Sequence, residues 1–261
     1  MRVGFIGAGN MAGALAGAIQ SAEPNTEFVA SDVSSEQLER FVGGLQRATT
    51  APDNRSVVDT AELTFLSVKP QVLGEVLPEL AHTPALVVSV VAGVRIATLE
   101  AALPQARVVR VMPNTPGLVG EMAAGYAGGT RATADDVALV GRLLESAGVA
   151  LPMDEELLDA VTGVSGSGPA FVARLIEAFT DAAAAHGLDR DVAYRLVLQT
   201  FAGTARLLDE KGLSPQELVD MVSSKGGTTV AGRRVLESSD YADVIRRTVD
   251  AAVARSRELG S

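Results

Sequence analysis

A glycine-rich turn lies between an apolar run and a helical run at the very start of this 261-residue chain. Residues 3–13 read VGFIGAGNMAG, which places Gly7, Gly9 and Ala12 in a G-x-G-x-x-A pattern. Gly7 permits a tight turn, Gly9 lets the backbone approach a pyrophosphate, and Ala12 is small enough for a helix to pack against a strand. The strand–turn–helix context makes the pattern specific. The segment therefore predicts a strand–turn–helix unit that binds a dinucleotide.

The first half of the chain alternates short apolar runs with helical patterns. We expect strands at Arg2–Gly7, Glu27–Ser31, Thr64–Val68, Leu86–Val90, Arg107–Val111, Met122–Tyr126 and Val149–Leu151, with helices at 36–45, 72–81, 96–103 and 135–147 between them. The runs are nearly continuous rather than alternating, which suits a parallel sheet covered on both faces. The fold class is therefore α/β, with an N-terminal Rossmann-type doubly wound sheet.

The character changes at about Asp154, after which the chain looks helical. Helices are expected at 157–161, 169–186, 190–211, 215–221, 229–237 and 241–258. We therefore predict a dinucleotide-binding Rossmann domain over residues 1–153. An all-α domain for substrate binding and dimerisation follows over residues 154–261.

One predicted helix, residues 170–185, carries apolar side chains around nearly its whole circumference. A helix that is apolar all round must be buried all round. About a hundred helical residues cannot easily surround it within one subunit, which favours a homodimer through the C-terminal helices. The alternative is that this helix is the centre of an ordinary bundle in one chain.

Composition excludes several classes of site and partner. The chain has no cysteine, and its two histidines, His82 and His186, are far apart in sequence, so we expect no metal site. The net charge of −10 argues against nucleic acid and anionic membranes as partners. The longest apolar stretch, Leu86 to Val94, is too short to span a membrane. With no signal-peptide pattern before the first strand, we expect a cytoplasmic protein.

Two further glycine clusters occur in the helical half. The segment Ser223–Thr229 reads SSKGGTT before a helical run, and consecutive amides there make a seat for a small carboxylate. The segment Ser165–Phe171 reads SGSGPAF. It either lines the site or serves only to start the next helix, with Ser167 as its cap and Pro169 in its first turn.

Polar residues at strand ends suggest how a coenzyme is held. Asp32 follows the second strand, where a carboxylate can accept from the ribose hydroxyls and repel a 2′-phosphate, which tilts the prediction toward NAD. The nearby Ser31, Ser34 and Ser35 could still bind a phosphate. Lys69 stands at the end of another strand. Asn114 either lies beside the nicotinamide or belongs to a turn that only redirects the chain.

Together these motifs resemble the pyrroline-5-carboxylate reductase family. The resemblance spans the whole chain and rests on FIGAGNM at 5–11, Asn54, SVKP at 67–70, VVAG at 90–93, RVMPNTP at 110–116, SGSGPAF at 165–171 and SSKGGTT at 223–229. It implies reduction of L-1-pyrroline-5-carboxylate to L-proline with NADPH or NADH, the last step of proline biosynthesis. It also implies a homodimer that often assembles further into a decamer.

The resemblance and the polar residues at strand ends together predict roles for individual residues. The expected coenzyme contacts are Ile6, Gly7, Ala8, Gly9, Asn10, Met11, Asp32, Asn54, Val68, Lys69, Pro70, Ala92, Gly93 and Asn114. The expected substrate contacts are Ser224, Lys225, Gly226, Gly227, Thr228 and Thr229, with Thr229 near the imine nitrogen as the catalytic candidate. Lys225 stands where many members have proline, and Asp32 replaces the patterns that members use near a 2′-phosphate.

Two rival functions remain at this point. A dehydrogenase of the 3-hydroxyisobutyrate type shares the two-domain plan but uses a lysine on the helix leading into the helical core, and residues 171–185 contain none. A dinucleotide-sensing or scaffold protein could retain the fold without turnover. The intact Ser224–Thr229 cluster argues against that reading.

Overall fold

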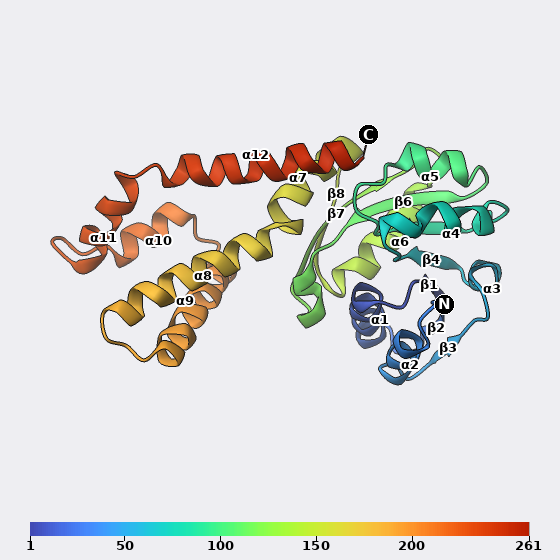
Figure 1. Ribbon diagram of the computed structural model, residues 1–261, viewed down its shortest axis with the longest axis horizontal. Helices are drawn as coiled ribbons and strands as arrows, with labels where there is room; N and C mark the ends of the chain where they lie inside the picture. The colour runs from blue at the N-terminus through green and yellow to red at the C-terminus, as the bar shows by residue number, and fades with distance from the viewer. Residues whose placement is uncertain (261) are drawn as a thin grey trace. The chain divides into compact units, whose positions relative to one another are not determined.

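A computed structural model describes residues 1–260 and contains one eight-stranded sheet (Figure 1). Its strands are β1 (Arg2–Ile6), β2 (Glu27–Ser31), β3 (Ala48–Thr50), β4 (Leu63–Leu66), β5 (Leu86–Ser89), β6 (Arg107–Met112), β7 (Met122–Gly128) and β8 (Gly148–Pro152). They are ordered β3-β2-β1-β4-β5-β6-β7-β8. The first six give the 3-2-1-4-5-6 order of a doubly wound dinucleotide-binding sheet, as the sequence predicts.

Helices cover both faces of this sheet. They are α1 (Asn10–Ala22), α2 (Ser35–Gly43), α3 (Asn54–Thr60), α4 (Leu73–Leu80), α5 (Ile96–Ala102) and α6 (Ala134–Glu145). One apolar core joins the sheet to α1, α2 and α6, and it contains a stack of Phe5 on Phe65 at 5.0 Å between ring centroids. A second core joins the sheet to α3, α4 and α5. These two layers bury the continuous apolar strands on both sides.

The sheet departs from the prediction in two places. Strand β7 runs antiparallel to β6, because only residues 113–121 separate them and a parallel pair needs a crossover of a dozen or more residues. That connection contains a short 3₁₀ helix, η2 (Thr115–Val119). The edge strand β3 and the helix α3 have no predicted counterpart, since both are too short and too polar to show a clear hydrophobic period.

The second half is helical. It contains η3 (Glu155–Leu157), α7 (Leu158–Val161), a π-helical turn η4 (Thr162–Gly166), α8 (Gly168–Ala185), α9 (Arg190–Lys211), α10 (Pro215–Val222), α11 (Thr228–Glu237) and α12 (Tyr241–Leu259). Helix α8 begins at Gly168, one residue before Pro169, and Ser167 separates it from the π turn. The expected helices are therefore present with shifts of one or two residues at their ends.

The described chain forms two compact units. They meet between residues 167 and 168, whereas the sequence predicts a boundary between residues 153 and 154. The first, the Rossmann unit, contains residues 1–167 together with the end of the chain from Ala251 onward, and the helical unit contains Gly168–Asp250. The end of α12 belongs to the Rossmann unit because the hydroxyl of buried Ser256 donates to Asp159 Oδ1 at 2.7 Å. Arg95 Nη2 lies 3.4 Å from the other carboxylate oxygen of Asp159.

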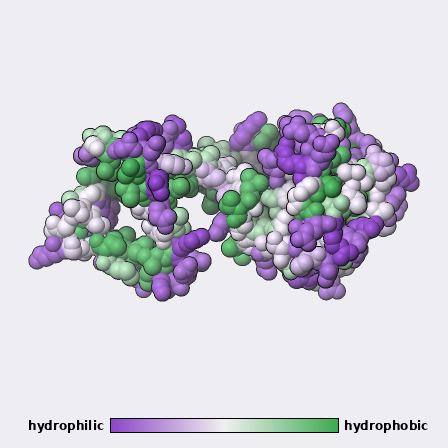
Figure 2. Space-filling model, turned by 90° about the horizontal axis from the view of Figure 1, so that it is seen from below, coloured by the Kyte–Doolittle hydropathy of each residue, from purple (hydrophilic) through white to green (hydrophobic). Residues whose placement is uncertain are grey.

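The helical unit has almost no interior of its own. Of its residues only Thr180 and Ala193 are buried. On α8, Val172, Leu175 and Phe179 are exposed, and Figure 2 shows hydrophobic side chains in green on the surface of this unit. The alternative that α8 is the buried centre of a bundle within one chain is therefore wrong. An apolar helix left open in one chain is typical of a subunit interface.

No helix in residues 1–260 is both long enough and apolar enough to cross a membrane.

Candidate functional site

The candidate coenzyme site lies where the order of strands reverses, between β1 and β4. Ile6 and Leu66 are register partners at the carboxyl ends of these strands. The amide of Ser67 donates to the carbonyl of Ile6 at 2.8 Å, and the amide of Gly7 donates to the carbonyl of Ser31 at 2.9 Å. The ends of β1, β2 and β4 are thereby joined at one crevice, where ligands bind in open α/β sheets.

Gly7 makes the turn after β1 with a φ of +88°, in the region that favours glycine. A Cβ at this position would lie 2.7 Å from the carbonyl oxygen of Ser67, so the turn has no room for a side chain. The buried Ser67 hydroxyl has no hydrogen-bond partner in the described chain. A close-fitting turn beside an unpaired hydroxyl fits a bound dinucleotide.

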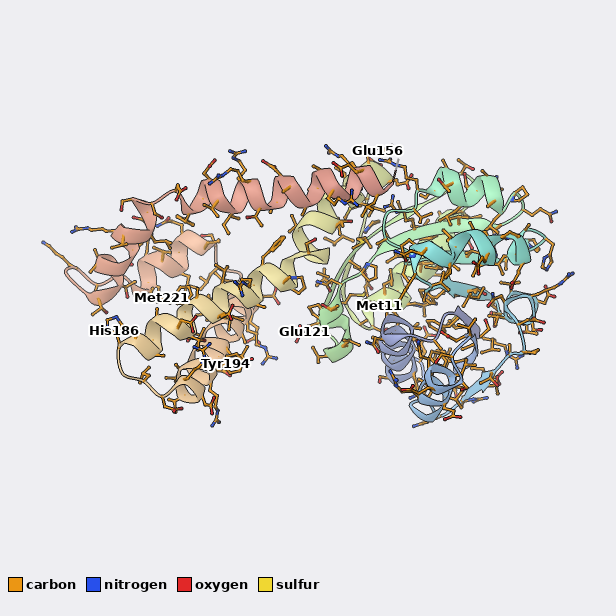
Figure 3. All side chains as sticks on the ribbon, viewed as in Figure 1. Met11, Glu121, Glu156, His186, Tyr194 and Met221 are labelled. Carbon is orange, nitrogen blue, oxygen red and sulfur yellow. The ribbon has the colours of Figure 1, made fainter. Side chains whose placement is uncertain are left out.

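The N-terminus of α1 points its first amides at the same crevice. Gly9 is the N-cap residue and provides no side chain to cap the helix, and the first turn has no acidic residue. Asn10 and Met11 form that first turn, and Figure 3 labels Met11 on it. A hollow of about 290 Å³ borders the turn and is lined in part by Ala8, Gly9 and Asn10. Uncapped amides at a helix start favour a phosphate group.

Asp32 follows β2 and reaches back to the glycine turn. Its Oδ2 accepts from the amide of Ala8 at 2.7 Å, and its Oδ1 accepts from the amide of Ser34 at 2.8 Å. Ser34 in turn caps α2 by accepting from the amide of Gln37 at 3.3 Å. The carboxylate therefore fixes the turn after β1 relative to the start of α2.

Asn54, the first residue of α3, joins two more elements to this edge. Its Oδ1 accepts from the hydroxyl of Ser31 at 2.6 Å, and its Nδ2 donates to Glu79 Oε2 at 2.8 Å. The preceding Asp53 caps α3 through Ser56, and hydrogen bonds from Ser56 hold the pKa of Asp53 below its ordinary value. Glu79 lies on α4, and no spacing in the sequence points to it.

The predicted contacts after β4 and β5 also lie at carboxyl strand ends. Val68 and Lys69 follow β4, with Lys69 exposed, and Pro70 starts the short helix η1 (Pro70–Val72). Ala92 and Gly93 follow β5. Gly93 has a φ of +76°, and a Cβ there would lie 3.2 Å from the Cβ of Leu259 in the same unit.

Asn114 is buried, and both ends of its amide are in use within the protein. Its Oδ1 accepts from the amide of Ala123 at 2.9 Å, and its Nδ2 donates to the carbonyl of Ser165 at 3.1 Å. The side chain therefore joins the turn after β6 to β7 and to the π-helical turn. These contacts give Asn114 a positioning role at the end of β6.

The predicted substrate loop connects α10 to α11 in the helical unit. Gly226 has a φ of +74°, and the amide of Gly227 donates to the carbonyl of Ser224 at 2.9 Å. Gly227 is the N-cap residue of α11 and offers no side-chain cap, so the amides of Thr228 and Thr229 are open. Lys225 is exposed at the tip of this loop, which follows Met221, labelled in Figure 3.

The structure thus gathers the predicted coenzyme contacts of β1, β2, α3 and β4 at the carboxyl ends of neighbouring strands. The predicted substrate contacts form a continuous loop of the helical unit. The sequence analysis missed Ser67 as a buried hydroxyl and Glu79 as a partner of Asn54. Both follow from strand pairing and helix packing, which no local pattern reveals.

Comparisons with known proteins match both halves of the chain. A family model described as pyrroline-5-carboxylate reductase dimerisation matches residues 155–259, and one described as NADP oxidoreductase coenzyme F420-dependent matches residues 2–93. The chain is 41% identical to the pyrroline-5-carboxylate reductase of Methanosarcina acetivorans, covering 99% of this chain and 98% of the relative. It is 40% identical to that of Arabidopsis thaliana, covering 99% and 95%.

Solved structures give the same result. The pyrroline-5-carboxylate reductase of Coxiella burnetii has a TM-score of 0.91 at 33% identity and covers 99% of this chain and 98% of its own. The pyrroline carboxylate reductase of Plasmodium falciparum, solved with NADP bound, has a TM-score of 0.82 at 30% identity and covers 100% of this chain and 98% of its own. Because the likeness extends over the full length of both chains, this protein belongs to the pyrroline-5-carboxylate reductase family.

Proposed function

We propose that this protein reduces L-1-pyrroline-5-carboxylate to L-proline by hydride transfer from NAD(P)H, the last step of proline biosynthesis. The observation that carries the proposal is full-length identity of about 40% to pyrroline-5-carboxylate reductases from an archaeon and a plant. The glycine turn at the β1–β4 switch point supports the coenzyme half of the reaction.

The coenzyme is held by the edge of the sheet. The turn from Ile6 to Gly9 and the first amides of α1, at Asn10 and Met11, hold the pyrophosphate. Asp32 holds the adenosine ribose. The remaining contacts come from Asn54, Val68, Lys69, Pro70, Ala92, Gly93 and Asn114, and Asn114 acts by fixing the turn after β6. Bound NAD(P)H supplies the hydride.

The substrate carboxylate is held by the loop from Ser224 to Thr229. The open amides at the start of α11 and the left-handed turn at Gly226 suit a small anion. The Lys225 ammonium adds positive charge beside it. In this proposal the loop supplies the substrate-binding half of the reaction.

No strong general base is required for this chemistry. A proton activates the imine nitrogen, a hydride adds to the imine carbon, and the product is the secondary amine of proline. Holding donor and acceptor in register supplies much of the acceleration. The Thr229 hydroxyl hydrogen-bonds the ring nitrogen and orients the ring.

A coupled test separates this proposal from its rivals. The purified protein should oxidise NADH or NADPH when pyrroline-5-carboxylate is added, and proline should accumulate in equal amount. Reduction of NAD+ or NADP+ when 3-hydroxyisobutyrate is added would instead support the rival dehydrogenase. No turnover with either substrate would support a sensing or scaffold role.

Thr229→Ala should lower kcat roughly 3- to 10-fold, the worth of one neutral hydrogen bond. The Kd of the coenzyme should stay unchanged, and Thr229→Ser should keep most of the activity because it retains the hydroxyl. Unchanged turnover in Thr229→Ala would remove this residue from the site.

We also propose that the protein is a homodimer built through its C-terminal helices. The support is the helical unit, in which only Thr180 and Ala193 are buried, together with the matching dimerisation family at 155–259. The start of that match also supports a functional boundary between residues 153 and 154. Further assembly into a decamer and a cytoplasmic location stay predictions.

Leu175→Glu should weaken the dimer, because the side chain is 41% exposed on α8 in a single chain and would place a charge in the interface. Arg174→Gln, on the neighbouring and far more exposed position, is the matched control. Sedimentation velocity at several protein concentrations measures the effect. A monomeric parent protein, or equal behaviour of the two variants, would contradict this interface.

A further inference from the structure

The carboxylate of Asp32 is fixed at the end of β2 before any coenzyme arrives. Each of its oxygens accepts one backbone amide, from Ala8 at 2.7 Å and from Ser34 at 2.8 Å. Each oxygen still has a free lone pair. A carboxylate at this position of a dinucleotide-binding sheet accepts from the ribose 2′-hydroxyl, whereas a 2′-phosphate would meet it charge against charge.

A second carboxylate stands behind the same strand end. Ser31 directly precedes Asp32, and its hydroxyl donates to Asn54, whose Nδ2 donates to Glu79 Oε2 at 2.8 Å. One of the two N–H donors of Asn54 is therefore already turned onto a negative group. The hydrogen-bond chain ends on the Glu79 carboxylate, which adds a negative charge next to Asn54.

The arginines of this region are paired with other carboxylates, and one of them, Arg40, also lines the hollow beside Ala8 and Gly9. Residues 31–60 contain five carboxylates and three arginines. Arg40 pairs with Glu36 on its own helix at 3.0 Å, and Arg55 pairs with Asp59 on its own helix at 3.7 Å. The third, Arg47, is 3.0 Å from Glu27. No described arginine of this segment is joined to Asp32 or Asn54.

We propose that Asp32, with Glu79 behind it, makes this reductase select NADH over NADPH. The inference rests on the proposed function, since it concerns the coenzyme of that reaction. It names a preference between two coenzymes, which the family assignment leaves open.

The primary test is direct binding of each coenzyme to the purified full-length protein without substrate, by titration calorimetry. NADH should bind at least about tenfold more tightly than NADPH, because like charges brought together at a binding site discriminate strongly. Asp32→Ser should shift the ratio of the two Kd values toward NADPH by about tenfold, and Glu79→Gln by a smaller factor of about threefold.

Matched variants distinguish the loss of a negative charge from damage to the coenzyme-binding turn. Glu75→Gln removes a carboxylate one turn earlier on α4 and should leave the ratio unchanged. If Asp32 only holds the Ala8 and Ser34 amides, Asp32→Ser will raise the Kd values of NADH and NADPH by the same factor, and the inference is overturned. Glu79 is exposed, so Glu79→Gln removes its negative charge without disturbing the turn after β1.

Other outcomes are equally decisive. Tighter binding of NADPH by the parent protein overturns the inference and leaves the proposed function standing. If Arg40→Gln then removes that preference, Arg40 reads the phosphate. Absence of binding by both coenzymes overturns the proposed function and this inference with it.

Discussion

Replacement of Gly7 by alanine tests the turn on which the coenzyme site depends. The backbone at Gly7 has a φ of +88°, and the added Cβ would lie 2.7 Å from the carbonyl oxygen and 2.9 Å from the carbonyl carbon of Ser67. Both neighbours are backbone atoms of the strand end, so neither can rotate away. The turn, β4 or both must move.

The expected change in the free energy of unfolding combines three terms. A left-handed backbone costs a non-glycine residue about 1–2 kcal/mol. Relief of the overlap by moving a packed strand end costs a further 1–3 kcal/mol or so. The lower entropy of the unfolded alanine chain returns about 0.4–1 kcal/mol. We therefore expect Gly7→Ala to destabilise the protein by about 1–4.5 kcal/mol, or roughly 3–14 °C in the unfolding midpoint.

Thermal unfolding without coenzyme measures this change, because bound coenzyme would shift the midpoint itself. The matched control is Gly17→Ala on α1, where an added Cβ meets nothing within 4 Å. It should stabilise the protein by up to about 1 kcal/mol through helix propensity. Equal unfolding midpoints for the two variants would refute the reasoning.

Two further predictions concern buried charges. Burial raises the pKa of Asp136, but hydrogen bonds from Thr133 and the charge of Arg107 outweigh it, so the pKa lies below the ordinary 3.8. Its contribution to stability is full above that value and is lost as the pH falls through the folded pKa. Asp136→Asn should therefore lower the free energy of unfolding by about 1–2 kcal/mol near pH 7 and by much less near pH 3, as measured by urea unfolding. An equal loss of stability at the two pH values would contradict this. Arg110, whose side chain is 4% exposed, lies 2.8 Å from Glu155. Arg110→Met should lower the free energy of unfolding by about 2–4 kcal/mol, because it leaves the Glu155 carboxylate without its cation. A second change, Glu155→Gln, should restore part of the lost stability. If no stability is recovered, the ion pair is not what stabilises this site.

The sequence alone determined the class of fold and the kind of ligand. Continuous apolar strands can be stable only in a sheet covered on both faces, and the Gly7–Gly9 turn allows one helix to start against a phosphate. The apolar circumference of α8 indicated a partner, and that helix is open in the single chain.

Tertiary structure decided what local patterns cannot encode. The direction of β7 follows from the length of its connection to β6, and the pairing of Ser31, Asn54 and Glu79 needs three elements packed side by side. The sequence shows only that Asp32 is a carboxylate that follows a strand. In the fold it is a carboxylate held by the amides of Ala8 and Ser34, because long-range hydrogen bonds form only once the chain has closed its sheet.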